Sequence, residues 1–200
     1  MSVDLGADPH VDDAIKRVFD IAAALVGIVL LGLPAILIAL TVKLTSKGPV
    51  LYWSDRVGRE NRLFRMPKFR TMRLDTPIVA THLLQDPCRY ITPVGAILRK
   101  TSLDELPQLW CILTGDMSVV GPRPALFNQT DLGKLRTDAG VHTLVPGLTG
   151  WAQVSGRDQL PISTKVEFDA YYLHHRSLAF DLRVIGLTLI KVIKRDGVDH

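Results

Sequence analysis

The strongest constraint on this chain is an uncharged apolar run from Ile21 to Val42. Its 22 residues are enough to cross the hydrocarbon core of a bilayer as one straight helix. A secretory signal has a shorter apolar core followed by small residues at a cleavage site, whereas Lys43-Leu44-Thr45 follows this run directly. The sequence therefore predicts a retained membrane segment, which supplies much of the 47% hydrophobic content.

The path of this segment through the membrane is left open by the residues. Pro34 lies inside the run, where it removes an internal hydrogen bond and can break the helix, so that the chain enters and returns through one leaflet. A proline-kinked helix that spans the bilayer is the alternative. Because cations flank both ends, Lys16 and Arg17 before the run and a basic cluster after it, the positive-inside tendency does not choose between the two.

The remaining patterns predict a mainly α-helical chain with a short β-hairpin. Two strands at 50–53 and 63–66 flank a turn at 58–61. Helices are expected at 13–42, 106–113, 162–175 and about 181–194, the last so apolar that it packs in a core or lies in the membrane interface. Loops with a short helix are expected at 75–95, an extended loop at 121–124, and irregular structure at 140–156.

Two adjacent acids, Asp104 and Glu105, are the first candidate catalytic residues. They lie between Arg99 and Lys100 upstream and Arg123 downstream. A carboxylate pair surrounded by cations can hold a divalent metal beside an anionic substrate, while one acid acts as nucleophile or base. Arginine suits bidentate phosphate contact, and the prolines on both sides of Arg123 hold it in a stiff loop. On spacing alone, a surface salt bridge explains Arg123 equally well.

The acid pair also has a purely structural interpretation. The segment from Ser102 to Glu105 matches a capping box at the start of a helix. Pro107 would then lie where its missing N–H should be bonded, so a helix that starts slightly later fits better. Spacing alone favours neither interpretation.

A basic cluster that spans 18 residues follows the apolar run. Its members are Arg56, Arg59, Arg62, Arg65, Lys68, Arg70 and Arg73. Cations next to a membrane segment can attract anionic lipid headgroups, each adding roughly 1 kcal/mol. Nucleic-acid binding, with Phe64 and Phe69 as stacking residues, is a competing interpretation. Since it explains neither the membrane segment nor the acid pair, we expect no nucleic-acid partner.

Three motifs resemble the bacterial sugar transferase family, the monotopic phosphoglycosyl transferases. They are Lys68-Phe69-Arg70-Thr71-Met72, the segment 98–124 that holds the acid pair, and the glycine-rich segment 147–157, which ends in Arg157. The resemblance runs in order from about Lys16 to Lys194. It implies transfer of a sugar phosphate from a UDP-sugar to undecaprenyl (polyprenyl) phosphate, with Mg²⁺ as cofactor and release of UMP.

The resemblance also implies roles for single residues. Asp104 corresponds to the nucleophile, which forms a covalent phosphosugar intermediate in a ping-pong reaction. Glu105 corresponds to the second acid, which assists with the metal or with protons. The remaining implied residues are basic ones expected to hold phosphates or nucleotide: Lys68, Arg70, Arg99, Arg123 and Arg157.

The family further implies a re-entrant helix–break–helix, with the active site at the cytoplasmic face of the bacterial inner membrane. The expected organisation is a polar N-terminus at 1–12, the membrane element at 13–48 and a compact α/β-type catalytic domain at 49–200 with interfacial amphipathic helices. Many members have Ser-Pro at the break where this chain has Leu33-Pro34, and Cys111 stands where asparagine is common. Membrane lipid and downstream glycosyltransferases are the implied partners.

Two other functions compete with this one. The chain could be a membrane-anchored basic module that binds lipid or nucleic acid without catalysis, or a membrane phosphohydrolase with water as acceptor. The sequence identifies neither the sugar nor the glycan pathway.

Overall fold

The computed structural model describes residues 9–77, 86–156 and 160–194. This part of the chain is mainly helical, as predicted, with two small sheets. The first half contains α1 (Pro9–Thr45), β1 (Leu51–Val57), η1 (Arg59–Asn61), β2 (Leu63–Phe69), α2 (Pro87–Tyr90), α3 (Pro93–Thr101), η3 (Leu103–Gln108) and α4 (Leu109–Thr114). The second half contains β3 (Ser118–Val120), β4 (Ala125–Leu126), α5 (Thr130–Asp138), η4 (Val141–Thr143), β5 (Gly147–Thr149), α6 (Trp151–Ser155), α7 (Ile162–His175) and α8 (Leu178–Lys194).

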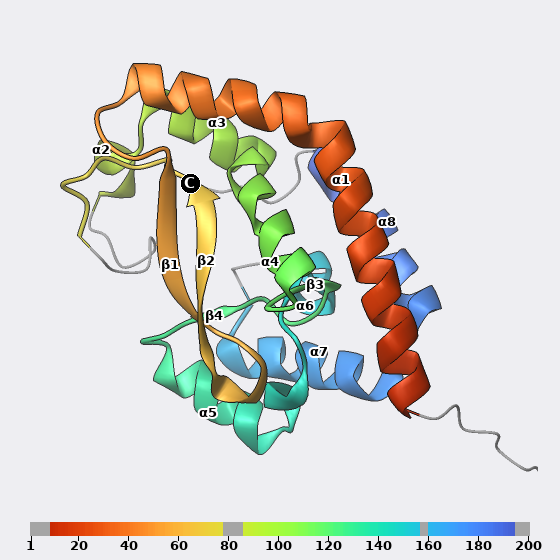
Figure 1. Cartoon of the computed structure of the whole chain (residues 1–200). Helices are drawn as coiled ribbons and strands as arrows, with labels where there is room; N and C mark the ends of the chain where they lie inside the picture. The colour runs from red at the N-terminus through yellow and green to blue at the C-terminus, as the bar shows by residue number, and fades with distance from the viewer. Residues whose placement is uncertain (1–8, 78–85, 157–159, 195–200) are drawn as a thin grey trace, which may run out of the picture.

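The apolar run forms the greater part of α1, a single helix that continues through Pro34. Figure 1 shows a sharp bend where the red N-terminal limb of α1 meets the orange C-terminal limb. Proline is a common cause of such bends, and in place of the predicted break between two helices the structure has one continuous, bent helix. Large apolar side chains along α1 are exposed, among them Val29 at 81% and Leu44 at 75%. Within the described ranges, α1 is the helix long and apolar enough to cross a membrane.

The N-terminal limb of α1 is attached to the rest of the protein by polar side chains. Lys16 Nζ lies 2.6 Å from Asp181 Oδ2 on α8. Asp20 is buried, and its Oδ1 accepts hydrogen bonds from Ser118 Oγ and from the backbone N–H of Val119, both at 3.0 Å. α1 begins at Pro9, inside the stretch 1–12 that was expected to be loosely ordered; residues 1–8 lie outside the described ranges.

The C-terminal limb of α1 is attached to the same body. Val42 is buried in a cluster with Phe69 of β2 and Leu98 of α3. Immediately after the helix, Ser46 accepts hydrogen bonds from Arg70 Nη2, at 2.9 Å to its backbone oxygen and 2.6 Å to its hydroxyl oxygen. Both ends of the apolar helix therefore lie against one compact domain.

The predicted hairpin is confirmed, with longer strands than expected. β1 and β2 pair antiparallel from Leu51 opposite Phe69 to Val57 opposite Leu63, and β4 adds to the other edge of β1. The turn between them contains Glu60 with φ 54°, a left-handed conformation uncommon for a residue other than glycine.

The prediction that residues 140–156 are irregular is wrong. This stretch contains η4, β5 and α6, and β5 pairs in parallel with β3. Each of these strands has only three residues, too short for an alternating pattern to be recognised. Gly121 and Gly147 allow the two backbones to approach closely, because a Cβ on either would collide with backbone atoms of the other segment.

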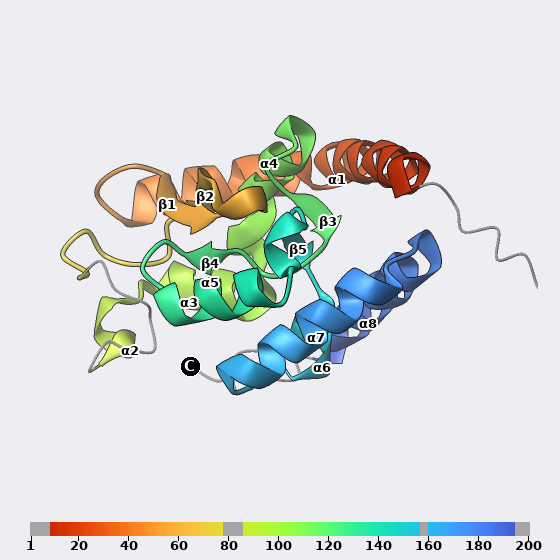
Figure 2. The same cartoon turned by 90° about the horizontal axis from the view of Figure 1, so that it is seen from below.

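The C-terminal helices form a layer behind the small sheets. Figure 2 shows α7 and α8 along one side of the molecule, with α1 and the hairpin on the other. α7 has the predicted bounds, and α8 begins three residues earlier than expected. Val184 is fully buried in a cluster with Tyr172, while Leu182 and Leu189 are more than half exposed. α8 therefore packs one face in the core and leaves another apolar face exposed.

Candidate active site

The acid pair lies in the short 3-10 helix η3, directly after α3. Ser102 joins the two helices in a left-handed backbone conformation, with φ 58°, and its side chain makes no capping hydrogen bond to η3. The capping box suggested by the spacing is therefore not formed. The carboxylates of Asp104 and Glu105 instead face cations that come from other elements.

The two acids differ in how tightly cations hold them. Glu105 Oε1 accepts hydrogen bonds from Lys68 Nζ at 2.6 Å and from Arg123 Nη2 at 3.2 Å. The nearest cation to Asp104 within the described ranges is the same Lys68, with 4.0 Å between Nζ and Oδ2. Asp104 is nonetheless 93% buried, since its exposed fraction is 7%. Glu105 is thus fixed by two ion pairs, whereas Asp104 is buried beside one of them.

The pKa values of the two carboxyl groups move apart. Burial raises the pKa of Asp104, and the opposing effect of Lys68 is too small to cancel it. Burial alone would also raise the pKa of Glu105, but Lys68 and Arg123 outweigh it and lower that pKa to about 2. Groups whose environments push their pKa values apart are typical of active sites.

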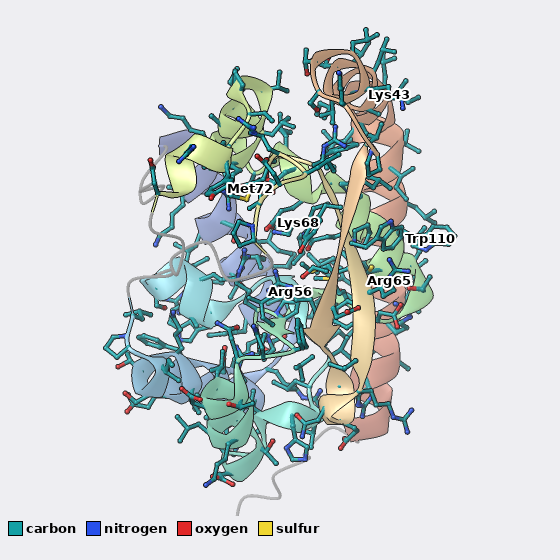
Figure 3. The ribbon with its side chains drawn as sticks, turned by 90° about the vertical axis from the view of Figure 1, so that its left-hand side faces the viewer. Lys43, Arg56, Arg65, Lys68, Met72 and Trp110 are labelled. Atoms are coloured by element: carbon teal, nitrogen blue, oxygen red, sulfur yellow. The ribbon has the colours of Figure 1, made fainter. Side chains whose placement is uncertain are left out.

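The hairpin places Lys68 against η3. Side chains alternate along a strand, so Lys68 lies on the same face of β2 as Met66. Met66 is buried against Cys111 and Ile112 of α4, the helix that continues from η3. Figure 3 shows Lys68 beside the hairpin, in the middle of the molecule. The strand register therefore determines which cation reaches the acid pair.

Arg56 also belongs to this site, although the sequence indicated it only as a member of the basic cluster. Its Nη1 donates to the backbone oxygen of Pro124 at 3.2 Å, and its Nε donates to Ser54 Oγ at 3.1 Å. Burial, and then the nearby charge of Arg123, lower the pKa of Arg56 to about 10, while Glu105 acts in the opposite direction. Its position on the Lys68 side of the hairpin is seen in Figure 3. Only the register between the strands could have indicated this role.

The other predicted basic residues take different places. The charge of Arg99, in the last turn of α3, partly opposes the rise that burial causes in the pKa of Asp104. Arg70 is 95% buried, and its guanidinium binds Ser46 at the end of α1, which gives it a contact outside the acid pair. Arg157 lies outside the described residues. Substrate binding by Arg70 and Arg157 stays a prediction.

The donor set of the acid pair suits Mg²⁺. Proteins usually hold this ion through one or two carboxylates, while water and substrate phosphates complete its octahedral shell. No cluster of three or more His, Cys, Asp or Glu side chains suited to a metal occurs among the residues that the structure describes. A divalent cation at Asp104 and Glu105 would take its remaining ligands from water and from the phosphates of a substrate.

The sequence of the chain is similar to those of several known proteins. Residues 11–195 match the model of a family described as bacterial sugar transferase. A UDP-galactose-lipid carrier transferase of Erwinia amylovora is 38% identical over 204 residues, which cover 94% of this chain and 42% of the relative. A UDP-glucose:undecaprenyl-phosphate glucose-1-phosphate transferase of Escherichia coli is 38% identical over 189 residues, 90% of this chain and 40% of the relative.

A third relative has nearly the same length as this chain. It is a sugar transferase of Bacillus subtilis, EpsL, 39% identical over 189 residues that cover 93% of this chain and 91% of the relative. The chain thus spans about two fifths of the two relatives named for a reaction, and about nine tenths of EpsL.

Proposed function

Because the chain belongs to the bacterial sugar transferase family, we propose that it transfers sugar 1-phosphate from a UDP-sugar to undecaprenyl phosphate and releases UMP. The relatives from Erwinia amylovora and Escherichia coli carry names that describe a sugar donor and a lipid carrier or undecaprenyl phosphate acceptor. The reaction is proposed for this chain from its family, from its acid pair and from the exposed apolar helix α1.

The observation that supports the proposal is that cations bind Glu105 more closely than Asp104. Glu105 is fixed between Lys68 and Arg123, while the ion pair of Asp104 within the described ranges, with Lys68, is longer at 4.0 Å, and its carboxylate is buried and less solvated. A carboxylate that is not locked in short ion pairs can move onto a phosphorus atom. Asp104 is therefore the nucleophile in this proposal, and Glu105 organises the cations around it.

The proposed reaction has two displacements at one phosphorus. An oxygen of Asp104 attacks the sugar-linked phosphorus of the donor, the bond from that phosphorus to the bridging oxygen breaks, and UMP leaves with that oxygen. An oxygen of undecaprenyl phosphate then attacks the same phosphorus, the bond to Asp104 breaks, and the carboxylate is restored. Because UMP leaves before undecaprenyl phosphate reacts with the modified enzyme, the reaction has ping-pong kinetics.

The cations suit the charge that develops in these steps. Lys68, Arg123 and Arg56 approach the acid pair from the hairpin and from the loop at 121–124, and Arg99 approaches from α3. Preorganised cations stabilise a phosphoryl group in the transition state without rearrangement. Mg²⁺ held by Asp104 and Glu105 would supply further neutralisation of the donor phosphates.

We also propose that α1 is re-entrant and that both of its ends face the cytoplasm. Lys16 and Asp20 attach the first limb to the domain, and Ser46 attaches the end of the second limb to the same domain. A straight span would carry these two ends about 30 Å apart, on opposite sides of the bilayer. This arrangement lets a cytosolic UDP-sugar meet a lipid phosphate at the inner membrane, where downstream glycosyltransferases would take the product.

Single-cysteine labelling in cells tests this topology. Ala14→Cys and Lys47→Cys, each exposed and near one end of α1, should both resist a membrane-impermeant maleimide until the inner membrane is opened. The native cysteines are replaced by serine in this background. Labelling of position 14 alone in intact spheroplasts would indicate a spanning helix and overturn the re-entrant proposal.

UMP release by purified protein in nanodiscs tests the reaction. A panel of UDP-sugars is offered with Mg²⁺, with and without undecaprenyl phosphate. We expect sustained UMP release with at least one donor that needs the lipid, complete loss in Asp104→Asn, and wild-type rates in the control Asp116→Asn, an exposed acid near the same segment. Release that continues without lipid would indicate a phosphohydrolase, and full activity of Asp104→Asn would overturn the nucleophile assignment.

A further inference from the structure

The loop that carries Arg123 is held at every residue. The N–H of Gly121 donates to the Thr149 oxygen, the Pro122 oxygen accepts from the N–H of Gly147, and the Pro124 oxygen accepts from Arg56. Two prolines restrict φ along the same stretch. The backbone oxygen of Arg123 completes the set, and its partner comes from α5, an element that carries no residue of the acid site.

That partner is Arg136. Its Nη1 donates to the backbone oxygen of Arg123 at 2.8 Å, while Nε and Nη2 both donate to Asp169 Oδ2 on α7, at 3.0 and 2.7 Å. One guanidinium thus joins three elements: the loop at 121–124, α5 and α7. Asp169 binds Nε and Nη2 of this guanidinium, and Nη1 remains directed at the loop.

The burial of this pair shows how strictly the guanidinium is oriented. The side chains of Arg136 and Asp169 are 12% and 2% exposed, so neither can exchange its partner for water without rearrangement. Buried ion pairs are often replaceable by apolar residues without loss of stability. A fold-stabilising role therefore gives little reason for an arginine at 136, whereas the third hydrogen bond, to the loop, requires its planar fork.

We propose that Arg136 and Asp169 are positioning residues that set the location of Arg123 over the acid pair. The proposal rests on the proposed function, in which Arg123 holds donor phosphates beside Glu105. Asp169 orients Arg136, Arg136 fixes the Arg123 carbonyl, and the guanidinium of Arg123 then reaches Glu105 Oε1 at 3.2 Å. A shift of the order of 1 Å in such a chain of contacts can lower turnover by about 10²-fold.

A first test measures the loop itself and needs no activity. Hydrogen–deuterium exchange of the loop amides at 121–127 is compared in wild type, Asp169→Asn and Asp181→Asn. The Asp181 pair with Lys16 is a matched control, because that carboxylate is also 2% exposed and its cation lies at 2.6 Å. We expect faster exchange of these amides in Asp169→Asn, and little change in Asp181→Asn. Equal exchange in both variants would overturn the proposal, whether or not the protein releases UMP.

A second test is a double-mutant cycle on UMP release. If Asp169 acts only by placing Arg123, then Asp169→Asn should lower kcat by about 10- to 100-fold in the wild-type background and by less than about 2-fold in Arg123→Gln, since coupled residues are not additive. Asp181→Asn should have the same relative effect in both backgrounds. Additive losses for Asp169→Asn would assign it a general structural role and overturn the proposal.

A conservative variant covers the case in which Asp169→Asn does not fold. Arg136→Lys keeps the positive charge beside Asp169 but cannot direct a fork at both the carboxylate and the loop carbonyl. We expect it to melt close to wild type and still show the faster exchange at 121–127 and the non-additive loss with Arg123→Gln. Wild-type exchange and turnover in Arg136→Lys would refute the positioning role. A wild-type protein without UMP release would refute the proposed function alone.

Discussion

The attachment of α1 to α8 can be tested by removing one charge from a buried pair. Lys16→Met removes the cation from the Asp181 side chain, which is 2% exposed, and leaves it the Tyr172 hydroxyl at 2.7 Å as a side-chain partner among the described residues. Removing one partner of a buried ion pair costs about 3–5 kcal/mol, because the remaining charge is desolvated and uncompensated. For a chain of this length each kcal/mol lowers Tm by about 2–4 °C. We therefore expect Tm to fall by at least about 6 °C.

The two partners should not be equivalent. In Asp181→Asn the new amide oxygen can still accept from Tyr172, and Lys16, already 19% exposed, can turn its ammonium toward water. That variant should lose only about 1–3 kcal/mol, the typical cost of one disturbed buried group. The double variant Lys16→Met/Asp181→Asn should then be more stable than Lys16→Met, since the buried charge has been removed.

Scanning fluorimetry of the detergent-solubilised protein provides the assay. The fluorescence of Trp151 should respond to displacement of α8, because the centroid of its ring lies 5.2 Å from that of Phe180 on α8. Asp75→Asn, which breaks an exposed pair with Arg73, serves as the control and should shift Tm by less than about 2 °C. A Tm for Lys16→Met within that margin, or a double variant less stable than Lys16→Met, would refute the reasoning.

Two further predictions concern single residues. Gly121→Ala should destabilise the protein and abolish turnover, because the added Cβ would collide with the backbone oxygen of Val145. Gly133→Ala, in open space within α5, should instead raise Tm slightly. Equal Tm values for the two variants would contradict this packing argument. Cys111 should resist alkylation at pH 8 in a Cys88→Ser background, because burial, and to a smaller extent Asp116, raise its pKa to about 11 and keep the thiol protonated. Alkylation of Cys111 as fast as in the unfolded protein would contradict this prediction.

Local patterns in the sequence were sufficient to predict several elements. Short runs rich in apolar and aromatic residues on both sides of the turn at 58–61 indicated the hairpin, and the amphipathic pattern of 162–175 predicted α7 with its observed bounds. The uncharged run gave α1 and its exposed apolar surface. These features depend on neighbours within a few residues, which is the range over which periodicity and turn preferences act.

Contacts between distant segments were not predictable in the same way. Arg136 lies 33 residues from Asp169 and 13 from Arg123, and the sequence motifs did not mark any residue of α5 as part of a site. Arg70, grouped with Lys68 by the motif, instead binds Ser46, because it directly follows the end of β2, where the chain lies beside the end of α1. The parallel pairing of β3 and β5 likewise depends on close backbone approach rather than on a repeating pattern.

The most direct test of the central claim is the intact mass of the protein after exposure to its donor without lipid acceptor. If Asp104 is the nucleophile, wild type should gain the mass of one sugar phosphate, release an equal amount of UMP, and lose the added mass when undecaprenyl phosphate is supplied. The adduct should be on the peptide that contains Asp104 and should be missing from Asp104→Asn. A donor that supports full turnover with lipid, yet gives neither adduct nor UMP without it, would contradict the covalent mechanism.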